Sequence, residues 1–394
     1  MHYSINSLFT QIGLYVIIRI MEKNTGFTDV IILAGGIGER LWPASKPDCP
    51  KQFMSFSDGV SLLQSAVMRA LALNPSGKII IITKKDLLKI TADTVSSLLT
   101  KLSEVEKDKV LNSLSILAEP YQRHTSAPLV LASKMLEKSD GKSHTVLVLA
   151  SDHVIGPTES FVNDCRKAAS AAGQDFFVCF AIPPLSPNTG YGYIKFGSPI
   201  GDDKTILKID SFEEKPNLET AKQYLASGLY AWNSGMFAFK TDFFLSEVKS
   251  LAPDVYSAFD CLDGAELPAE KKLGCVNYTS DWDMMDKAYS LVPAIAVDKS
   301  VAERTKRAAA VRSSFHWDDV GSWDAFEKYF KENDEKTVEV ESLNNFVYSD
   351  IPVALCGVED LIVVIKDGKA LVMKKGSSSS MREVIKAVEK AGCK

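Results

Sequence analysis

The chain has 394 residues, 46% hydrophobic and 24% charged, which is the composition of a globular protein with a large buried core. Its net charge of −5 argues against a general affinity for nucleic acid or for an anionic membrane, so any basic site must be local. The seven scattered cysteines form no CxxC pair, and no two of the five histidines are spaced like zinc ligands. These features favour reduced thiols in the cytoplasm over a disulfide framework.

The first twenty residues are moderately apolar, but their longest uncharged run is too short to cross a bilayer. They also lack the basic start and the small-residue cleavage site of a secretory signal. A more ordinary opening begins at Met21. We therefore expect residues 1–27 to be an N-terminal extension whose first twenty residues are dispensable.

Short apolar runs alternate with helical patterns along the first half of the chain. The expected strands are residues 30–33, 78–83, 114–118, 145–150 and 176–182, and the expected helices are 61–73, 85–100 and one that ends near 138. This alternation predicts βαβ units and a mostly parallel sheet. Ligands of such sheets lie beyond the carboxyl ends of the strands, where Gly35, Glu119 and Asp152 stand.

The pattern changes after residue 187. Antiparallel strands are expected at 191–194, 206–213 and 231–240, adding to the sheet and forming a lid over the crevice. A helix is expected near 281–290 and a strand near 294–297. Residues 299–312 carry five basic side chains around a run of alanines, which favours an exposed helix or loop.

The C-terminal tail is predicted to be a separate, β-rich region. A charged stretch at 331–336 marks its start, and short β-runs between turn signals precede a terminal helix at 381–390. The expected organisation is an α/β catalytic domain at 28–330, Rossmann-like with a mixed, mostly parallel sheet, and a small β-rich region at 331–394.

Residues 30–53, VIILAGGIGERLWPASKPDCPKQF, form the motif around which the chain is organised. A buried strand is followed at once by glycines, whose bare backbone lets N–H groups approach a phosphate chain. Arg40 and Lys51 bring two cations to the same mouth. The stretch therefore predicts a triphosphate site.

Two better-known phosphate loops do not fit. The dinucleotide pattern GxGxxG would need a glycine in place of Leu41, and prolines at 43, 47 and 50 prevent a following helix. The Walker pattern would need Gly-Lys-Ser/Thr where Arg40-Leu41-Trp42 stands. A glycine-rich loop without a ligand is the alternative for GGxG alone. The Arg, Trp-Pro and Pro-Lys-Gln-Phe at fixed offsets argue against it.

The motif closely resembles the opening motif of the sugar-nucleotide pyrophosphorylases. Its Arg-Leu-Trp-Pro and Pro-Lys-Gln-Phe strings are similar to those of the mannose-1-phosphate guanylyltransferase branch. The resemblance implies that the nucleotide is bound by the glycine loop, its two cations and a serine after the fourth strand: Leu33, Ala34, Gly35, Gly36, Gly38, Arg40, Lys51 and Ser151. It further implies catalytic roles for Arg40, Lys51 and Asp152.

Nucleotidyl transfer needs no general base, because the attacking phosphate oxygen is already ionised. It needs alignment and neutralisation of charge on the α-phosphate and the leaving group, which a divalent cation between two carboxylates provides. Asp152, at a strand end, and Asp319, in Trp-Asp-Asp-Val-Gly-Ser-Trp, are the candidates. Helix capping and an ordinary turn are the alternatives for each alone. The resemblance implies that both hold Mg²⁺, with Asp318 standing where serine is common.

Three further strings resemble the sugar-phosphate side of the family, although each alone could be a turn or core packing. They are NTGYGYI at 188–194, FEEKP at 212–216 and YAWNSGMF at 230–237. The resemblance implies that mannose is contacted by Gly192, Glu214 and Asn233, and its phosphate by Lys215. A looser match at 279–288 has Asp286 in place of glutamate, and His124 replaces an asparagine, so the roles of both positions stay open.

The resemblance implies a Mg²⁺-dependent enzyme that makes GDP-mannose from GTP and mannose 1-phosphate, without the isomerase cupin of longer relatives. One alternative is another sugar-1-phosphate nucleotidylyltransferase, such as a glucose-1-phosphate thymidylyltransferase. Another is a non-catalytic regulatory paralogue, which would be expected to have lost Arg40, Lys51, Asp152 or Asp319. We expect a cytoplasmic homodimer that binds neither nucleic acid nor membrane and whose subunits meet through the tail.

Overall fold

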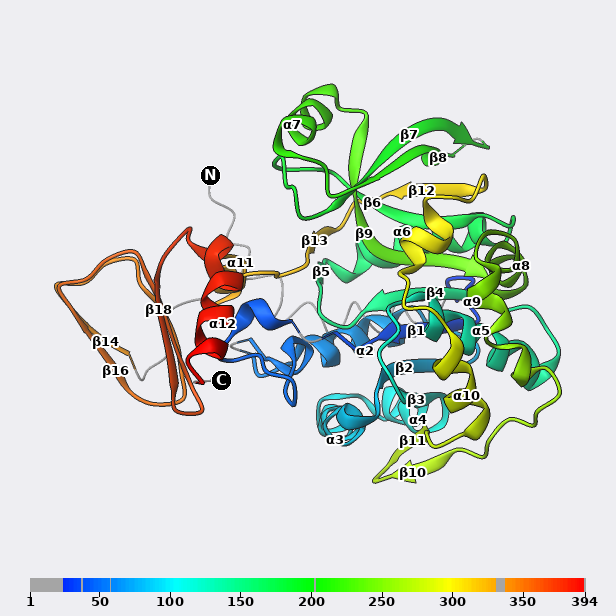
Figure 1. Cartoon of the computed structure of the whole chain (residues 1–394), viewed down its shortest axis with the longest axis horizontal. Coiled ribbons are helices and arrows are strands. Elements are labelled where there is room, and N and C mark those ends of the chain that lie inside the picture. The colour runs from blue at the N-terminus through cyan, green and yellow to red at the C-terminus, as the bar shows by residue number, and fades with distance from the viewer. Residues whose placement is uncertain (1–23, 37, 57, 202, 331–336, 393–394) are drawn as a thin grey trace.

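The computed structural model describes residues 24–36, 38–56, 58–201, 203–330 and 337–392. The expectations for residues 1–20 and for a boundary at 331–336 lie outside these ranges. Figure 1 shows a large α/β body and a smaller C-terminal β-structure beside it. Among the described residues, no helix is both long and apolar enough to cross a bilayer.

The body is built on one mixed sheet of eleven strands in the order β10-β11-β3-β2-β1-β4-β9-β6-β12-β8-β7. In chain order its strands are β1 (Asp29–Leu33), β2 (Ile79–Lys84), β3 (Leu114–Glu119), β4 (Thr145–Ala150), β6 (Phe177–Ile182), β7 (Gly192–Ile200), β8 (Asp203–Glu214), β9 (Tyr230–Lys240), β10 (Lys271–Leu273), β11 (Val276–Thr279) and β12 (Ala308–Arg312). The parallel pairs join β11, β3, β2, β1 and β4 in series, and β6 with β12. The predicted α/β class is confirmed.

Helices cover both faces of this sheet. They are α2 (Leu62–Ala72), α3 (Leu88–Leu98), α4 (Glu104–Ser113), α5 (Ser126–Asp140), α6 (Thr158–Ala172), α7 (Leu218–Ser227), α8 (Thr241–Leu251), α9 (Pro253–Ser257) and α10 (Asp283–Leu291). The start of α2 follows from its sequence, because Ser61 and Gln64 form a reciprocal capping box. The helices predicted near 61–73, 85–100 and 281–290 are thus confirmed within a few residues.

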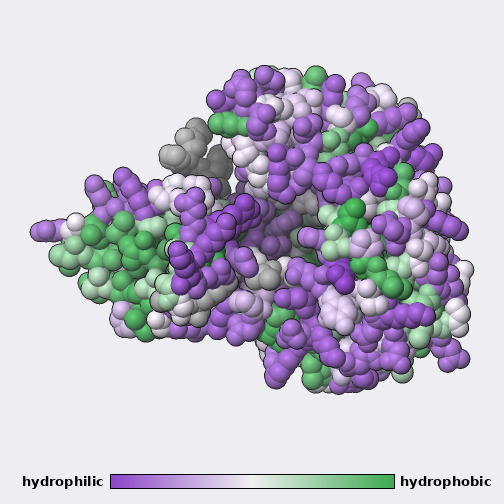
Figure 2. All heavy atoms as spheres, viewed as in Figure 1, coloured by the Kyte–Doolittle hydropathy of each residue, from purple (hydrophilic) through white to green (hydrophobic). Residues whose placement is uncertain are grey.

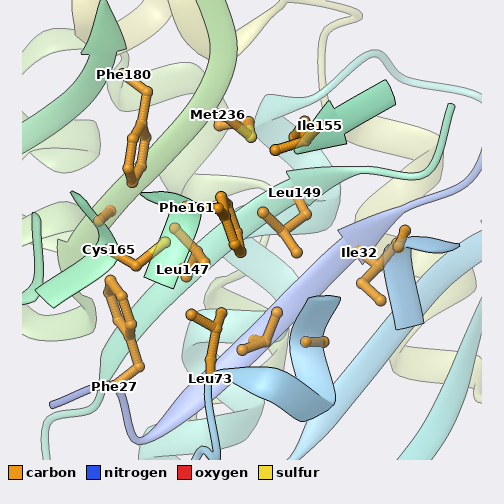
Figure 3. Packing of buried hydrophobic residues seen from close by; sticks show 14 of the residues in the cluster. Phe27, Ile32, Leu73, Leu147, Leu149, Ile155, Phe161, Cys165, Phe180 and Met236 are labelled. Atoms are coloured by element: carbon orange, nitrogen blue, oxygen red, sulfur yellow. The ribbon is translucent and has the colours of Figure 1, made fainter. Parts of the chain in front are cut away.

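Two apolar cores lie on opposite faces of the sheet because successive strand side chains alternate in direction. Val30 and Ile32 of β1 belong to one core, and Ile31 belongs to the other. Figure 3 shows the first core, where Phe161 and Cys165 of α6 pack over Leu147 and Leu149 of β4. This packing fixes the strand ends that carry the site.

The segment before the last sheet strand differs from its prediction. Residues 294–297 form no strand, and a π-helix, η7 (Asp298–Ala302), follows them. The run of alanines is no exposed loop, because it forms β12 and lies buried between β6 and β8. Its basic flanks lie at the strand ends, where Arg307 covers the ring of Phe176 and Arg312 that of Phe196. The charges therefore frame a buried strand.

After β12 the chain crosses back towards the first strand ends. Two short strands, β5 (Val154–Gly156) and β13 (His316–Asp318), pair antiparallel outside the main sheet. A short helix, α11 (Trp323–Phe326), follows. The pairing brings the Trp-Asp-Asp-Val-Gly motif alongside the segment that follows Asp152.

The tail contains β14 (Thr337–Val340), β15 (Phe346–Ser349), β16 (Val353–Cys356), β17 (Leu361–Lys366), β18 (Lys369–Lys374) and α12 (Met381–Lys390). Pairing is parallel from β14 to β16 and from β15 to β17, and in both pairs partners lie sixteen positions apart, Thr337 with Val353 and Phe346 with Ile362. One side of the tail packs on the body in a cluster that includes Leu41, Met54 and Trp323. The β-runs and terminal helix expected there are confirmed.

Candidate active site

The glycine loop leaves the carboxyl end of β1 and turns back over it. Its start is held by two side chains that donate to the carbonyl of Ala34, from Gln52 at 2.8 Å and from Thr83 at 3.1 Å. Gly38 has φ +67°, and a Cβ there would lie 2.5 Å from Cβ of Lys51. Only glycine permits this approach, so the sequence motif brings Lys51 against the loop.

Lys51 joins the two predicted metal carboxylate motifs. Its Nζ donates to Oδ2 of Asp152 at 3.0 Å and to the main-chain carbonyl of Asp319. The lysine side chain is 5% exposed and the aspartate 35%, so a lysine charge buried here is compensated. Burial favours neutral Asp152, but the charge and hydrogen bond of Lys51, together with His153, hold the pKa of that carboxyl below its usual value. Asp152 is therefore ionised at neutral pH.

Two hydrogen bonds hold the side chain of Asp319 in place. Tyr191 donates to Oδ1 at 2.7 Å, and the N–H of Gly321 also donates to that oxygen. A Cβ on Gly321 would lie 2.8 Å from Oδ2 of Asp319 and 3.1 Å from Nη2 of Arg40, so glycine lets both approach. The chain turns through Val320 at φ +45°, a strained conformation for a β-branched residue. Strain at this turn is typical of a functional site.

Asp318, the other acid of this motif, is engaged elsewhere. Its Oδ1 accepts from the N–H of Val320 at 2.7 Å, and its Oδ2 accepts from the hydroxyl of Tyr329 at 3.0 Å. These bonds shape the turn and leave Asp319, whose main-chain carbonyl accepts from Lys51, as the candidate metal acid beside Asp152.

The donor set fits a hard cation. Within the described ranges, no three His, Cys, Asp or Glu side chains gather as a protein-only metal site. Mg²⁺ commonly takes one or two carboxylates and completes its shell with water and substrate phosphates. Asp152 and Asp319, linked through Lys51 beside Arg40, offer that arrangement.

The predicted sugar residues lie on three adjacent strands. Gly192 of β7 is paired with Glu214 of β8, and a Cβ at Gly192 would meet Oε2 of Glu214 at 2.5 Å. Lys215, at φ +51°, donates to Oε1 of Glu214 at 2.6 Å. β9, which carries Asn233, pairs with β7. Figure 2 shows a hydrophilic hollow below the lobe formed by α7, β7 and β8.

The sequence missed one acid on this side. Asn233 donates from Nδ2 to Oδ1 of Asp298 at 2.8 Å, at the start of the π-helix. By contrast, the looser match at 279–288 lies at the β11 edge of the sheet, where Asp281 pairs with Lys85. For Asp298, the only signal available in the sequence was an acid directly after the apolar run 294–297.

Ser151 and Leu33 lie at the base of the loop, with the N–H of Ser151 donating to the carbonyl of Leu33 at 3.1 Å. The serine is 2% exposed, so it offers mainly support to the strand ends. Gly36 is exposed at the loop surface. His124 is exposed at φ +55°, so it is no packing residue.

Glu119, at the end of β3, lies beside the glycine loop. It is 5% exposed, and its Oε1 accepts from the hydroxyl of Tyr289 at 2.6 Å. A Cβ on Gly35 would lie 3.7 Å from Oε2. Burial raises the pKa of Glu119 to about 7, although the Tyr289 bond favours ionisation. A buried, half-ionised acid at a loop mouth is typical of a binding site.

A glycine loop, a lysine that links the carboxylate of Asp152 to the main chain at Asp319, and an acid-rich sheet edge together indicate an enzyme that acts on a nucleotide. Comparison with known families agrees, since the family described as Nucleotidyl transferase matches residues 29–336. The chain belongs to the nucleotidyl transferase family. A second family, described as MannoseP isomerase/GMP-like beta-helix domain, matches residues 335–388, the tail with the parallel pairing.

The chain is also similar to individual proteins whose names and structures are known. The chain is 32% identical to mannose-1-phosphate guanylyltransferase RfbM of Salmonella typhimurium over 90% of this chain and 71% of that protein. It is 34% identical to a mannose-1-phosphate guanylyltransferase of Salmonella montevideo over 91% and 73%. A crystal structure described as mannose-1-phosphate geranyltransferase from Thermus thermophilus superposes with a TM-score of 0.75 at 29% identity, covering 92% and 99%.

Proposed function

We propose that this protein is a mannose-1-phosphate guanylyltransferase, which forms GDP-mannose and diphosphate from GTP and α-D-mannose 1-phosphate with Mg²⁺. The observation that carries the proposal is the convergence of Lys51 on Asp152 and Asp319, with Arg40 against the same turn. Relatives named for this activity, matching about nine-tenths of the chain, support it.

The chain's residues would act by placement and charge. Backbone N–H groups of the glycine loop, with Arg40 and Lys51, would hold the triphosphate so that diphosphate leaves in line with the attacking oxygen. Asp152 and Asp319 would hold Mg²⁺, which neutralises charge developing on the α-phosphate when bound. Lys215 would hold the sugar phosphate whose oxygen attacks, and Glu214 and Asn233 would accept and donate hydrogen bonds at the sugar hydroxyls.

Glu119 supports guanine as the base. Its Oε2 has no hydrogen-bond partner among the described residues and lies beside Gly35. The N1–H and amino group of guanine form a donor pair that matches a carboxylate, with charge-assisted bonds. Thymine offers a single N–H flanked by two carbonyls, which a carboxylate would repel. The same feature makes a thymidylyltransferase the weaker alternative.

Retention of the catalytic set argues against the regulatory alternative, because a binding-only paralogue has no need of a lysine that joins the Asp152 carboxylate to the main chain at Asp319. Two further features are part of the proposal. Free cysteines across the described ranges fit a cytoplasmic enzyme, and exposed apolar side chains on the tail fit a homodimer.

The deciding experiment is a diphosphate-release assay over a grid of four nucleoside triphosphates and several sugar 1-phosphates. We expect the highest kcat/KM for GTP with mannose 1-phosphate, and we expect no diphosphate release without Mg²⁺. Faster turnover with dTTP and glucose 1-phosphate would replace the proposal by the thymidylyltransferase. Binding without turnover on any pair would favour the regulatory paralogue.

A further inference from the structure

Asp298 is the first residue of the π-helix that precedes β12, and its side chain contacts Asn233 of β9. Its Oδ1 accepts a 2.8 Å hydrogen bond from Nδ2 of Asn233. A π-helical turn is rare and is frequently found at functional sites. Nothing in the sequence motifs assigned a role to this acid.

The bond fixes which way the Asn233 amide faces. A carboxylate only accepts, so Asp298 requires the nitrogen of the amide on its own side. The amide oxygen then faces the N–H of Gly235, which donates to it at 3.2 Å. With both ends engaged, the amide cannot flip without losing two bonds, and its second N–H stays directed to a constant place.

The neighbouring charges belong to the same sheet edge. Burial, with a smaller contribution from the Glu214 carboxylate, raises the pKa of Asp298 above its usual value. Lys299, which is paired with Glu303 at 2.7 Å, and Lys215, which is paired with Glu214, carry the compensating charges. The sugar side thus contains an ordered network, and Asp298 links the π-helix to it.

We propose that Asp298 is a positioning residue of the monosaccharide subsite, which acts by holding the amide of Asn233 in the one orientation that binds a sugar hydroxyl. The proposal rests on the proposed function only for the identity of the sugar. It predicts an effect on the sugar phosphate and none on the nucleotide, because among the described residues the side chain of Asp298 bonds to Asn233 and not to the glycine loop or to Asp152 and Asp319.

The test compares Asp298→Ala with Asp298→Asn, using initial rates with each substrate varied in turn. Asp298→Ala removes the acceptor, and we expect KM for mannose 1-phosphate to rise about tenfold, with KM for GTP unchanged. The amide oxygen introduced by Asp298→Asn can still accept from Asn233, so this variant should recover most of the loss. Asp281→Ala, which removes an exposed acid at the opposite sheet edge, is the control.

Asn233→Ala provides a second arm. If Asp298 acts through Asn233, adding Asp298→Ala to Asn233→Ala should cost no more than Asn233→Ala alone. Additive losses, equal rises in both KM values, or an unaltered sugar KM in Asp298→Ala would each overturn the proposal. If the wild type prefers another sugar 1-phosphate, the proposed function fails, and the same comparison on that sugar still decides the role of Asp298.

Discussion

The hydroxyl of Tyr191 donates a hydrogen bond of 2.7 Å to Oδ1 of Asp319, although the two residues are 128 positions apart. Tyr191 belongs to the first sugar-side motif and Asp319 to the last motif of the catalytic body. The ring of Tyr191 packs edge-on against Trp232 and Trp317. Burial and the Asp319 charge raise the pKa of Tyr191, so its hydroxyl keeps its proton and remains a donor. The sugar and metal halves of the crevice are thereby joined directly.

Tyr191→Phe should therefore weaken the site formed by Asp152 and Asp319, while the phenyl ring keeps its packing against Trp232 and Trp317. We expect the Mg²⁺ concentration at half-maximal rate to rise several-fold and kcat to fall about tenfold, since one charge-assisted bond is lost. Rates over a Mg²⁺ titration measure this. Tyr193→Phe is the control, because it removes a hydroxyl two residues further along the chain that donates to the carbonyl of Asn188. Equal effects of the two variants would contradict the assignment.

Asp152→Asn and Asp319→Asn should each lower kcat by roughly a hundredfold or more and leave the fold intact. Each variant removes one negative charge from the two acids that Lys51 joins, through the carboxylate of Asp152 and the main chain of Asp319. Turnover at limiting Mg²⁺, with circular dichroism to check folding, measures the effect. Asp318→Asn serves as the contrast, because the carboxylate of Asp318 is bonded to the N–H of Val320 and to the hydroxyl of Tyr329. Near-normal turnover in either folded variant would remove that residue from the metal site.

The two lysines should separate the substrates. Lys51→Ala should lower kcat with little change in KM for mannose 1-phosphate, because Lys51 is buried against Asp152 beside the loop. Lys215→Ala should chiefly raise KM for mannose 1-phosphate, because Lys215 lies at the sugar edge with Glu214. Steady-state kinetics with each substrate varied gives both constants. Interchanged profiles would show that the crevice is divided the other way.

Glu119→Gln should alter both base choice and the pH dependence of stability. The amide loses the acceptor for one guanine donor, so kcat/KM for GTP should fall about tenfold or more relative to other nucleotides. The raised acid pKa stabilises the fold at low pH, and that stability is lost as pH rises from 4.5 through about 7. A rise in the pKa of Glu119 from 4.5 to about 7 corresponds to a change of roughly 3 kcal/mol in the free energy of unfolding. Urea unfolding of the Glu119→Gln variant should no longer show this change between pH 4.5 and about 7.

The tail offers an apolar face that we expect to join two subunits. Five of its apolar side chains are between 51% and 70% exposed: Val338, Val340, Leu343, Ile351 and Val372. They lie in the C-terminal β-structure that is coloured green at the left of Figure 2. Val340→Lys with Val372→Lys should yield a monomer by light scattering, whereas Val105→Lys on α4 should not change the mass. An unchanged mass in the double variant would exclude this face.

The parts of the fold that could be predicted depended on strong local signals. The strands near Val30 and Leu147 are runs of large apolar residues with a glycine or an aspartate two positions beyond their ends, and such runs form buried parallel strands. The prediction for β12 was wrong because alanine carries little hydrophobic signal and its flanks are basic. The prediction for 294–297 was also wrong, because four apolar residues cannot distinguish a strand from the approach to a helix.

The site divides in the same way. Lys51, Asp152 and Asp319 could be proposed because each lies in a string with fixed neighbours. Asp298 could not, because its only evidence is a contact with Asn233, 65 positions away, made through a π-helix that no sequence pattern indicated. Tyr191 stood in a recognised motif, but its partner was set by the pairing of β13 with β5.

The sixteen-position spacing in the tail has a consequence for how this protein could change in length. Thr337 lies beside Val353, and Phe346 lies beside Ile362, so the backbone winds through equal coils that stack one on the next. A whole coil could be inserted or deleted and every remaining pair would keep its neighbour. An insertion of one residue within a strand would turn its buried side chains outward. Lineages should therefore differ here by complete coils, while the residues that face Leu41 and Met54 stay apolar.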